Sequence, residues 1–195
     1  VLSRLQAELG FSLQAASVDH GLRPEAAADV ARAAEQADRV GVPFHALRIQ
    51  VSPGASLQAR AREGRYGVLR ELAQRLGAGR VAIGHTQDDQ AESVLSRLLR
   101  GAGLAGLGAI QPLRADGGVR PLLDCRRSDV QRFALACFGE VAVDASNQDA
   151  RFERVRIRSH VAPVLTAEDP ALVRHLAQLA DDARDCMQLV HQLAE

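Results

Sequence analysis

The sequence predicts an α/β protein: a doubly wound parallel sheet with a helical C-terminal segment. Short apolar segments typical of strands alternate with longer helical segments over the first two thirds of the chain, which indicates βαβ units. Polar, glycine-containing tips follow two of these strands. Because ligands of open α/β sheets bind beyond the carboxyl ends of the strands, these two tips are the first places to look for a site.

Composition narrows the class of protein further. The 195 residues are 47% hydrophobic but only 3% aromatic, so aliphatic side chains must fill the core. The 24 acidic residues balance 24 basic ones, which disfavours a non-specific nucleic-acid coat. Every basic residue is arginine, so no lysine of this chain can act as a nucleophile. Three scattered cysteines without CxxC spacing disfavour a zinc ribbon, and no apolar run approaches a membrane span.

The first half of the chain alternates between helices and strands that end at glycine or proline. Leucines at helical spacing open the chain, and because a chain seldom begins inside a helix, we expect further residues upstream of Val1. Gly64 and Gly67 weaken the longest helix of this half. The expected elements are a helix over 1–9, a strand over 13–18, a helix over 24–40, a strand over 44–51 and a helix over 57–76.

The second half begins with the same alternation and ends in helices. Ser128 and Gln131 have the spacing of a capping box, which predicts that a helix begins there and runs to Gly139. We expect one domain over residues 1–140, and a basic motif with a helical extension over 141–195. The expected elements are a strand over 81–83, a helix over 88–99, a glycine-rich loop over 101–108, a strand over 119–123, the helix ending at 139, a basic helical segment over 151–165 and a final helix after 169–170.

The strongest local signal is the run from Gly84 to Glu92, where a strand ends and a helix begins. His85, Asp89 and Glu92 follow the spacing i, i+4, i+7, which would place them on roughly one helix face. An imidazole and two carboxylates at a strand end could hold Mg²⁺ together with nucleotide phosphates. The alternative is that acidic residues in a first helical turn only complement the helix dipole.

Three further motifs each allow a functional and a structural interpretation. Gly21 after a strand lets the backbone approach a ligand and Arg23 could meet phosphate, although Asp19 and Gly21 also suit an ordinary turn. The glycines of 101–108 follow a helix and lack Gly-Lys-Ser/Thr, so they indicate a helix end and a loop rather than a P-loop. On the helix over 57–76, Arg62 and Tyr66 share a face, for which a surface position is the default.

A basic block follows the segment 144–149. Arg154 and Arg158 are spaced i, i+4 and share a face, whereas Arg156 is expected to point elsewhere, toward Ile157 and Val161. Because guanidinium groups fork onto phosphate oxygens, the block favours binding of phosphate or RNA over a solvated helix face.

Taken together and in this order, these motifs closely resemble the tRNA(Ile)-lysidine synthase family of N-type ATP-pyrophosphatases, over about residues 18–165. The matching segments are Val18-Asp19-His20-Gly21-Leu22-Arg23, Ala61-Arg62-x-x-Arg65-Tyr66, Gly84-His85-Thr86-x-Asp88-Asp89-Gln90-Ala91-Glu92, Arg97-Leu98-x-Arg100-Gly101-x-Gly103-x-x-Gly106-Leu107, Arg120-Pro121-Leu122-Leu123 and Asp144-x-Ser146-Asn147-x-Asp149.

The resemblance implies an adenine nucleotide alpha hydrolase-like fold and a tRNA-modifying ligase. Such an enzyme uses ATP and Mg²⁺ to adenylate the wobble cytidine of the tRNA(Ile) with a CAU anticodon, and free L-lysine then displaces AMP. Cytoplasmic localisation is expected, and no membrane partner. Carried over by position, the catalytic residues would be His85, Asp89, Glu92, Arg62 and Arg154, the nucleotide-binding residues Val18, Asp19, His20, Gly84 and Arg156, and the metal ligand Asp89.

The chain also departs from the family pattern. The pyrophosphate loop, Ser-Gly-Gly-x-Asp-Ser, would lie just before Val1, and Val155 stands where the family usually has Asn. Two alternatives therefore stay open: a non-catalytic remnant that binds nucleotide or tRNA, and another tRNA-modifying enzyme of the same superfamily. The residues upstream of Val1 would distinguish the remnant from the enzyme, while 2-thiocytidine synthesis would require CxxC pairs.

Overall fold

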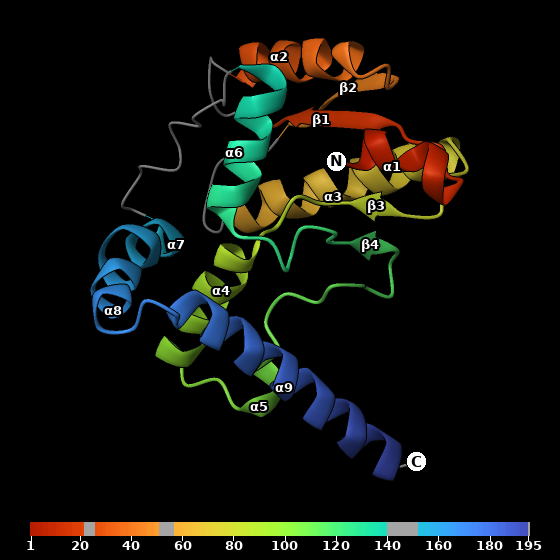
Figure 1. The fold of residues 1–195 in the computed structure, drawn as a ribbon. Coiled ribbons are helices and arrows are strands. Elements are labelled where there is room, and N and C mark those ends of the chain that lie inside the picture. Colours follow the sequence, from red (N-terminus) through yellow and green to blue (C-terminus); the bar gives the residue numbers. More distant parts are fainter. Residues whose placement is uncertain (22–25, 51–56, 140–151, 195) are drawn as a thin grey trace. The chain divides into compact units, whose positions relative to one another are not determined.

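The computed structural model describes residues 1–21, 26–50, 57–139 and 152–194. The chain forms two compact units, Val1–Val81 and Ala82–Glu195, which are described separately. Figure 1 shows the elements of each unit. The boundary predicted between residues 140 and 141 lies outside the described residues and stays a prediction.

The first unit contains a parallel βαβ arrangement. Helix α1 (Leu2–Leu9) ends at Gly10, whose φ of 67° is left-handed, as the sequence predicts. Strands β1 (Ala15–Asp19) and β2 (Phe44–Arg48) pair in parallel, with Ala15 opposite Phe44. Helix α2 (Ala26–Arg39) connects the two strands and packs against both. This pair confirms the predicted parallel pairing of the first two strands.

The long helix α3 (Leu57–Arg75) shows why a glycine is useful inside a helix. A Cβ atom on Gly64 would lie 3.1 Å from Cδ1 of the buried Ile49, tighter than an ordinary contact. Gly64 lowers helix propensity but lets Ile49 pack closely on α3. Strand β3 (Val81–Ala82) follows.

The second unit is built around helix α4 (Gln87–Leu99), which lies beside helix α9 (Leu172–Ala194) in Figure 1. Its core is aliphatic, as the low aromatic content predicts, and contains Ala91, Val94, Leu95, Ala109, Ile157, Val173, Leu176 and Ala180. Its other elements are α5 (Leu104–Leu107), β4 (Gly118–Val119), α6 (Arg127–Phe138), α7 (Glu153–Arg156), a π-helical turn (Ile157–Val161) and α8 (Ala162–Glu168).

Several predicted elements differ from the structure. The glycine-rich loop contains the short helix α5, and the strand predicted over 119–123 stops at Val119. Pro121 has no N–H to donate, and the Leu123 N–H donates to the Arg120 carbonyl at 3.2 Å, so the backbone turns. The predicted capping box is wrong, because α6 begins at Arg127 and Ser128 lies inside it.

Two further predictions concern cysteines and membranes. Cys125, Cys137 and Cys186 are all free thiols, as their spacing predicts. Among the helices of the described ranges, none is both long and apolar enough to cross a bilayer.

Candidate functional site

The start of α4 is fixed by a polar cap. The backbone N–H and the hydroxyl of Thr86 both donate to Oδ2 of Asp89, at 2.7 and 2.8 Å. Thr86 is buried, with 4% of its surface exposed. Asp89 therefore stabilises the N-terminus of α4, which agrees with the alternative that acidic residues in a first helical turn have a structural role. This contact uses only one of the two carboxylate oxygens of Asp89.

The other carboxylate oxygens face three arginines from distant parts of the chain. Oδ1 of Asp89 accepts hydrogen bonds from Arg127 at 2.8 Å and Arg154 at 2.7 Å. Glu92 accepts hydrogen bonds from Arg127 at 2.9 Å, from Nε of Arg154 at 2.8 Å and from Nε of Arg158 at 2.7 Å. We call Asp89, Glu92, Arg127, Arg154 and Arg158 the charge cluster. It joins α4 to α6, α7 and the π-helical turn.

Burial and charge oppose each other at the two carboxylates. Burial alone raises the pKa of Asp89, but hydrogen bonds from Thr86 and the charges of Arg154 and Arg127 outweigh it and lower that pKa. Burial likewise raises the pKa of Glu92, and hydrogen bonds from Arg158 and Arg154 with the charge of Arg127 lower it overall. Both groups stay ionised at neutral pH, so three guanidiniums face two carboxylates and the charge cluster has an excess positive charge.

A third acidic residue of α4, Asp88, attaches α6 to α4. Its Oδ2 accepts the backbone N–H of Arg127 at 2.7 Å, and Arg126 approaches at 3.4 Å. These contacts place the Arg127 side chain beside Asp89 and Glu92. For Arg127, burial disfavours the charged form, but Glu92 and Asp89 outweigh it and raise its pKa, so its charge is permanent.

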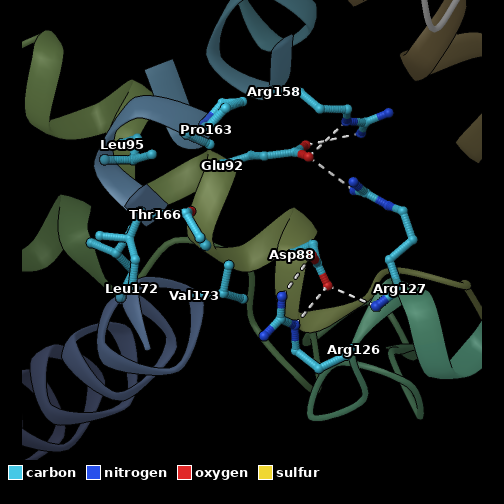
Figure 2. A pocket seen from close by; sticks show the side chains of 13 residues that line it. Asp88, Glu92, Leu95, Arg126, Arg127, Arg158, Pro163, Thr166, Leu172 and Val173 are labelled. Atoms are coloured by element: carbon cyan, nitrogen blue, oxygen red, sulfur yellow. Dashed lines mark hydrogen bonds and ion pairs between the residues drawn. The ribbon is translucent and has the colours of Figure 1, made fainter. Parts of the chain in front are cut away.

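Three residues of the charge cluster, Glu92, Arg127 and Arg158, line one end of a pocket whose other end is apolar. Figure 2 shows Glu92, Arg127 and Arg158 converging at the charged end, while Leu95, Pro163 and Val173 lie at the apolar end. The pocket has a volume of about 460 Å³ and lies within the second unit. Its shape and chemistry suit a small molecule with both a charged and an aliphatic part.

His85 differs from the prediction because it precedes the helix. Thr86 is the N-cap of α4, so helical spacing does not place His85 on the face of Asp89 and Glu92. Its Nδ1 accepts a hydrogen bond from Nε of the buried Arg120 at 3.4 Å. Gly84 is exposed, and a Cβ there would meet nothing within 4 Å, so a ligand can approach the backbone of Gly84.

The basic block separates into inward and outward arginines. Arg154 and Arg158 share a face as predicted, and both contact Glu92. Arg156 is exposed, so its predicted inward orientation is wrong; Val155 and Ile157 are the buried residues of this segment. The motif over 144–149 and Arg151 lie outside the described residues.

The polar tip of β1, in the first unit, is held by its own turn and by β2, where Nε of Arg48 lies 3.7 Å from Oδ2 of Asp19. Oδ1 of Asp19 accepts the backbone N–H of Gly21 at 2.7 Å, and the Asp19 carbonyl accepts the N–H of Ile49 at 2.8 Å. Val18 pairs with Leu47 in the sheet, and His20 follows at the strand end. Gly21 has a φ of 65°, which explains the glycine. Arg23 lies outside the described residues.

Arg62 on α3 keeps the predicted partner. Its Nη2 donates to the Tyr66 hydroxyl at 3.3 Å, and its guanidinium lies 5.1 Å from the Tyr66 ring centre. The predicted shared face is confirmed, while a role toward substrate stays a prediction.

Sequence reasoning missed Arg127 and Glu153. Arg127 occupies the first position of α6, where a cation opposes the helix dipole. Such an unfavourable position indicates that the arginine has a partner elsewhere in the fold. That signal was available but was hidden by the apparent capping box at Ser128.

Comparison with known proteins shows the family and the fold of the chain. The model of the PP-loop domain family matches residues 1–165, and the chain therefore belongs to that family. A solved U34-tRNA thiolase from Methanococcus maripaludis shares the fold with a TM-score of 0.69 and 13% identity, over 88% of this chain and 62% of that one. This match supports the α/β class predicted from the sequence.

Among curated proteins, the chain is similar to tRNA(Ile)-lysidine synthases. It is 43% identical to the one from Solibacter usitatus, over 90% of this chain and 40% of that protein. It is 46% identical to the one from Methylobacterium nodulans, over 87% of this chain and 50% of that protein. The chain thus spans about half the length of the curated relatives that it matches.

Proposed function

We propose that the protein is an ATP-dependent ligase that forms a carbon–nitrogen bond between lysine and the wobble cytidine of the tRNA(Ile) with a CAU anticodon. The observation that carries this proposal is the charge cluster, in which two ionised carboxylates and three arginines meet, and of which Glu92, Arg127 and Arg158 line one pocket. The similarity to tRNA(Ile)-lysidine synthases supports the same reaction.

The chemistry has two steps. The C2 carbonyl oxygen of cytidine attacks the α-phosphorus of ATP, and pyrophosphate leaves. The ε-amine of free lysine then attacks C2, forms the new C–N bond and releases AMP, while the amine loses its protons. Activation is needed because the carbonyl oxygen is a poor leaving group. The protein must therefore bind polyphosphate and a cationic amino acid close together.

The charge cluster offers groups for both tasks. Asp89 and Glu92 both stay ionised, and Glu92, which lines the pocket, can accept the ammonium of lysine once an arginine leaves it, while the apolar end of the pocket suits the methylene chain of lysine. Arg154 is the most exposed of the three arginines, with 41% of its side chain accessible. We infer that Arg154 can exchange a carboxylate partner for a phosphate oxygen, while Arg127 and Arg158 keep Glu92 paired.

The remaining residues take supporting roles in the proposal. Backbone from Val18 to His20 would line the adenine pocket, and the open backbone at Gly84 with the neighbouring His85 would face the nucleotide. Arg62 and the exposed Arg156 would hold phosphate, adenylate or the tRNA backbone. Because its substrate is tRNA, we place the reaction in the cytoplasm.

Magnesium does not fit Asp89 as the structure arranges it. Both oxygens of Asp89 already accept hydrogen bonds, from Thr86 on one side and from Arg127 and Arg154 on the other. Over the described residues, no group of three or more His, Cys, Asp or Glu could hold a metal ion. Mg²⁺ therefore stays a proposal that rests on the need to neutralise ATP, and no step is assigned to it.

The proposal is tested by lysine incorporation. The protein at its full natural length is incubated with ATP, Mg²⁺, radiolabelled lysine and a tRNA(Ile) transcript with a CAU anticodon. We expect label in the tRNA only when ATP is present, and none in a transcript whose wobble cytidine is replaced by uridine. Pyrophosphate release without incorporation would reject the lysine step. Nucleotide and tRNA binding without pyrophosphate release would instead favour the non-catalytic alternative.

A further inference from the structure

One face of α4 carries polar side chains along its whole length. Asp89, Glu92, Ser96 and Arg100 follow one another at spacings of three, four and four residues, which places them in one row. All four contact the short segment that begins at Glu153. The first two belong to the charge cluster, whereas the last two have no assigned role.

The unassigned end of the row holds Glu153. The Ser96 hydroxyl donates to Oε1 of Glu153 at 2.8 Å, and Arg100 forms an ion pair with Oε2. The hydrogen bonds from Arg100 and Ser96 lower the pKa of Glu153, so it is ionised at neutral pH. These three side chains do not line the pocket that contains Glu92 and Arg158. Glu153 directly precedes Arg154, so these contacts reach the charge cluster through the backbone of α7.

The start of α7 depends on such an attachment. Its four residues are the first turn of a helical segment that continues through the π-helical turn into α8, and a first helical turn frays without tertiary contacts. After its C-terminal end, Ile157 is 1% exposed and anchors the backbone in the core. At its N-terminal end, Glu153 fastens it to α4. Arg154 lies between these two anchors, directly after Glu153.

We propose that Ser96, Glu153 and Arg100 form a positioning clamp that holds Arg154 and Arg158 against Asp89 and Glu92. The proposal rests on the function proposed above, and it assigns to Glu153 a positioning role rather than a catalytic one. The Glu153–Arg100 pair is partly exposed, with 32% and 68% of the two side chains accessible, so the clamp adds little to global stability. Its effect is on how often Arg154 occupies its position in the charge cluster.

The first test needs no catalysis. Nε of Arg154 donates to Glu92, so its Nε–H proton is protected from exchange with water. We expect Glu153→Gln, which removes the ion pair but keeps the length, to speed exchange of this proton about three- to ten-fold in ¹⁵N NMR spectra. The matched control is Arg114→Ala, which breaks the exposed Arg114–Asp116 pair of the same unit. Equal exchange in wild type and Glu153→Gln would overturn the proposal.

The second test is a double-mutant cycle on lysine incorporation. Glu153→Gln is measured alone, with Arg154→Ala, and in combination. If Glu153 acts through Arg154, it lowers the rate about three- to ten-fold in the wild-type background and has no further effect once Arg154 is alanine. A purely structural role would give the same fold-change in both backgrounds, together with a lower melting temperature. If Glu153→Gln fails to fold, Ser96→Ala replaces it, because this variant removes only one hydrogen bond to Glu153.

The two tests separate failure of the clamp from failure of the proposed function. If wild type incorporates no lysine, the function is rejected, and proton exchange at Arg154 still decides whether the clamp exists. If wild type is active and the exchange does not change, the clamp is rejected alone.

Discussion

The two polar tips that the sequence singles out have different kinds of partners. At the end of β1, Asp19 is held by the N–H of Gly21, two residues away, and by β2, where its charged partner, Arg48, is 76% exposed and 3.7 Å from Oδ2. At the start of α4, Asp89 and Glu92 are held by three arginines 35 to 66 residues away. A carboxylate held by its own turn and an exposed cation shapes that turn, whereas buried carboxylates that gather several distant cations indicate a site. The number and sequence distance of the charged partners, more than the residue type, distinguish the tip of β1 from the start of α4.

The largest expected effect is at Glu92. Glu92→Gln keeps the side-chain shape but removes a charge that three arginines share at a position only 5% exposed. We expect more than a hundred-fold loss of lysine incorporation and about 3 kcal/mol of lost stability, because buried cations lose their counter-charge. Urea denaturation and the incorporation assay measure the two. A variant with wild-type stability would show that the contacts of Glu92 do not resemble a buried ion pair.

Arg127 tests whether a distant partner matters as much as the carboxylate. Arg127→Ala removes one donor from both Asp89 and Glu92, and we expect about 2 kcal/mol of lost stability and a ten- to hundred-fold slower incorporation. Arg132→Ala, on the same helix, breaks only an exposed pair with Asp129 and serves as the control. A comparable loss in both variants would mean that α6 is sensitive to any change.

The pH dependence of stability tests the role of the charged carboxylates in the wild-type protein. The pKa values of Asp89 and Glu92 are lowered in the folded protein, so their contribution is present above the unfolded carboxyl pKa of about 4 and is lost as pH falls through the folded values. We expect the unfolding free energy of wild type to fall more steeply below about pH 4 than that of Glu92→Gln. Parallel curves in urea titrations would contradict the lowered pKa values.

The smallest expected effect is at the tip of β1. Asp19→Asn keeps an oxygen that accepts the Gly21 N–H, so stability changes by less than about 0.5 kcal/mol. Asp19→Ala removes that acceptor and costs about 1 kcal/mol. Thermal melts of the two variants check this. If Asn is as damaging as Ala, the ion pair between Asp19 and the exposed Arg48 contributes more stability than a surface pair should.

Sequence patterns predict what depends on neighbouring residues and miss what depends on distant ones. The amphipathic stripe predicts α4 within one residue, and i, i+4 spacing correctly places Arg154 and Arg158 on one face. The same spacing fails for His85, because the helix begins after it. The position of Arg127 indicates that it has a partner, but local pattern identifies the partners of neither Arg127 nor Glu153, since these are fixed only when α6 and α7 pack against α4.

The amide of Gln90 has a mechanical consequence for this site. It lies next to Asp89, is 1% exposed, and bonds the N–H of Ile110 at 2.8 Å and its carbonyl at 3.2 Å. These two hydrogen bonds to the backbone of one residue oppose rotation of α4 about its long axis. A ligand that binds Asp89 or Glu92 must therefore displace arginine side chains, because the helix that carries the two carboxylates cannot turn to expose them.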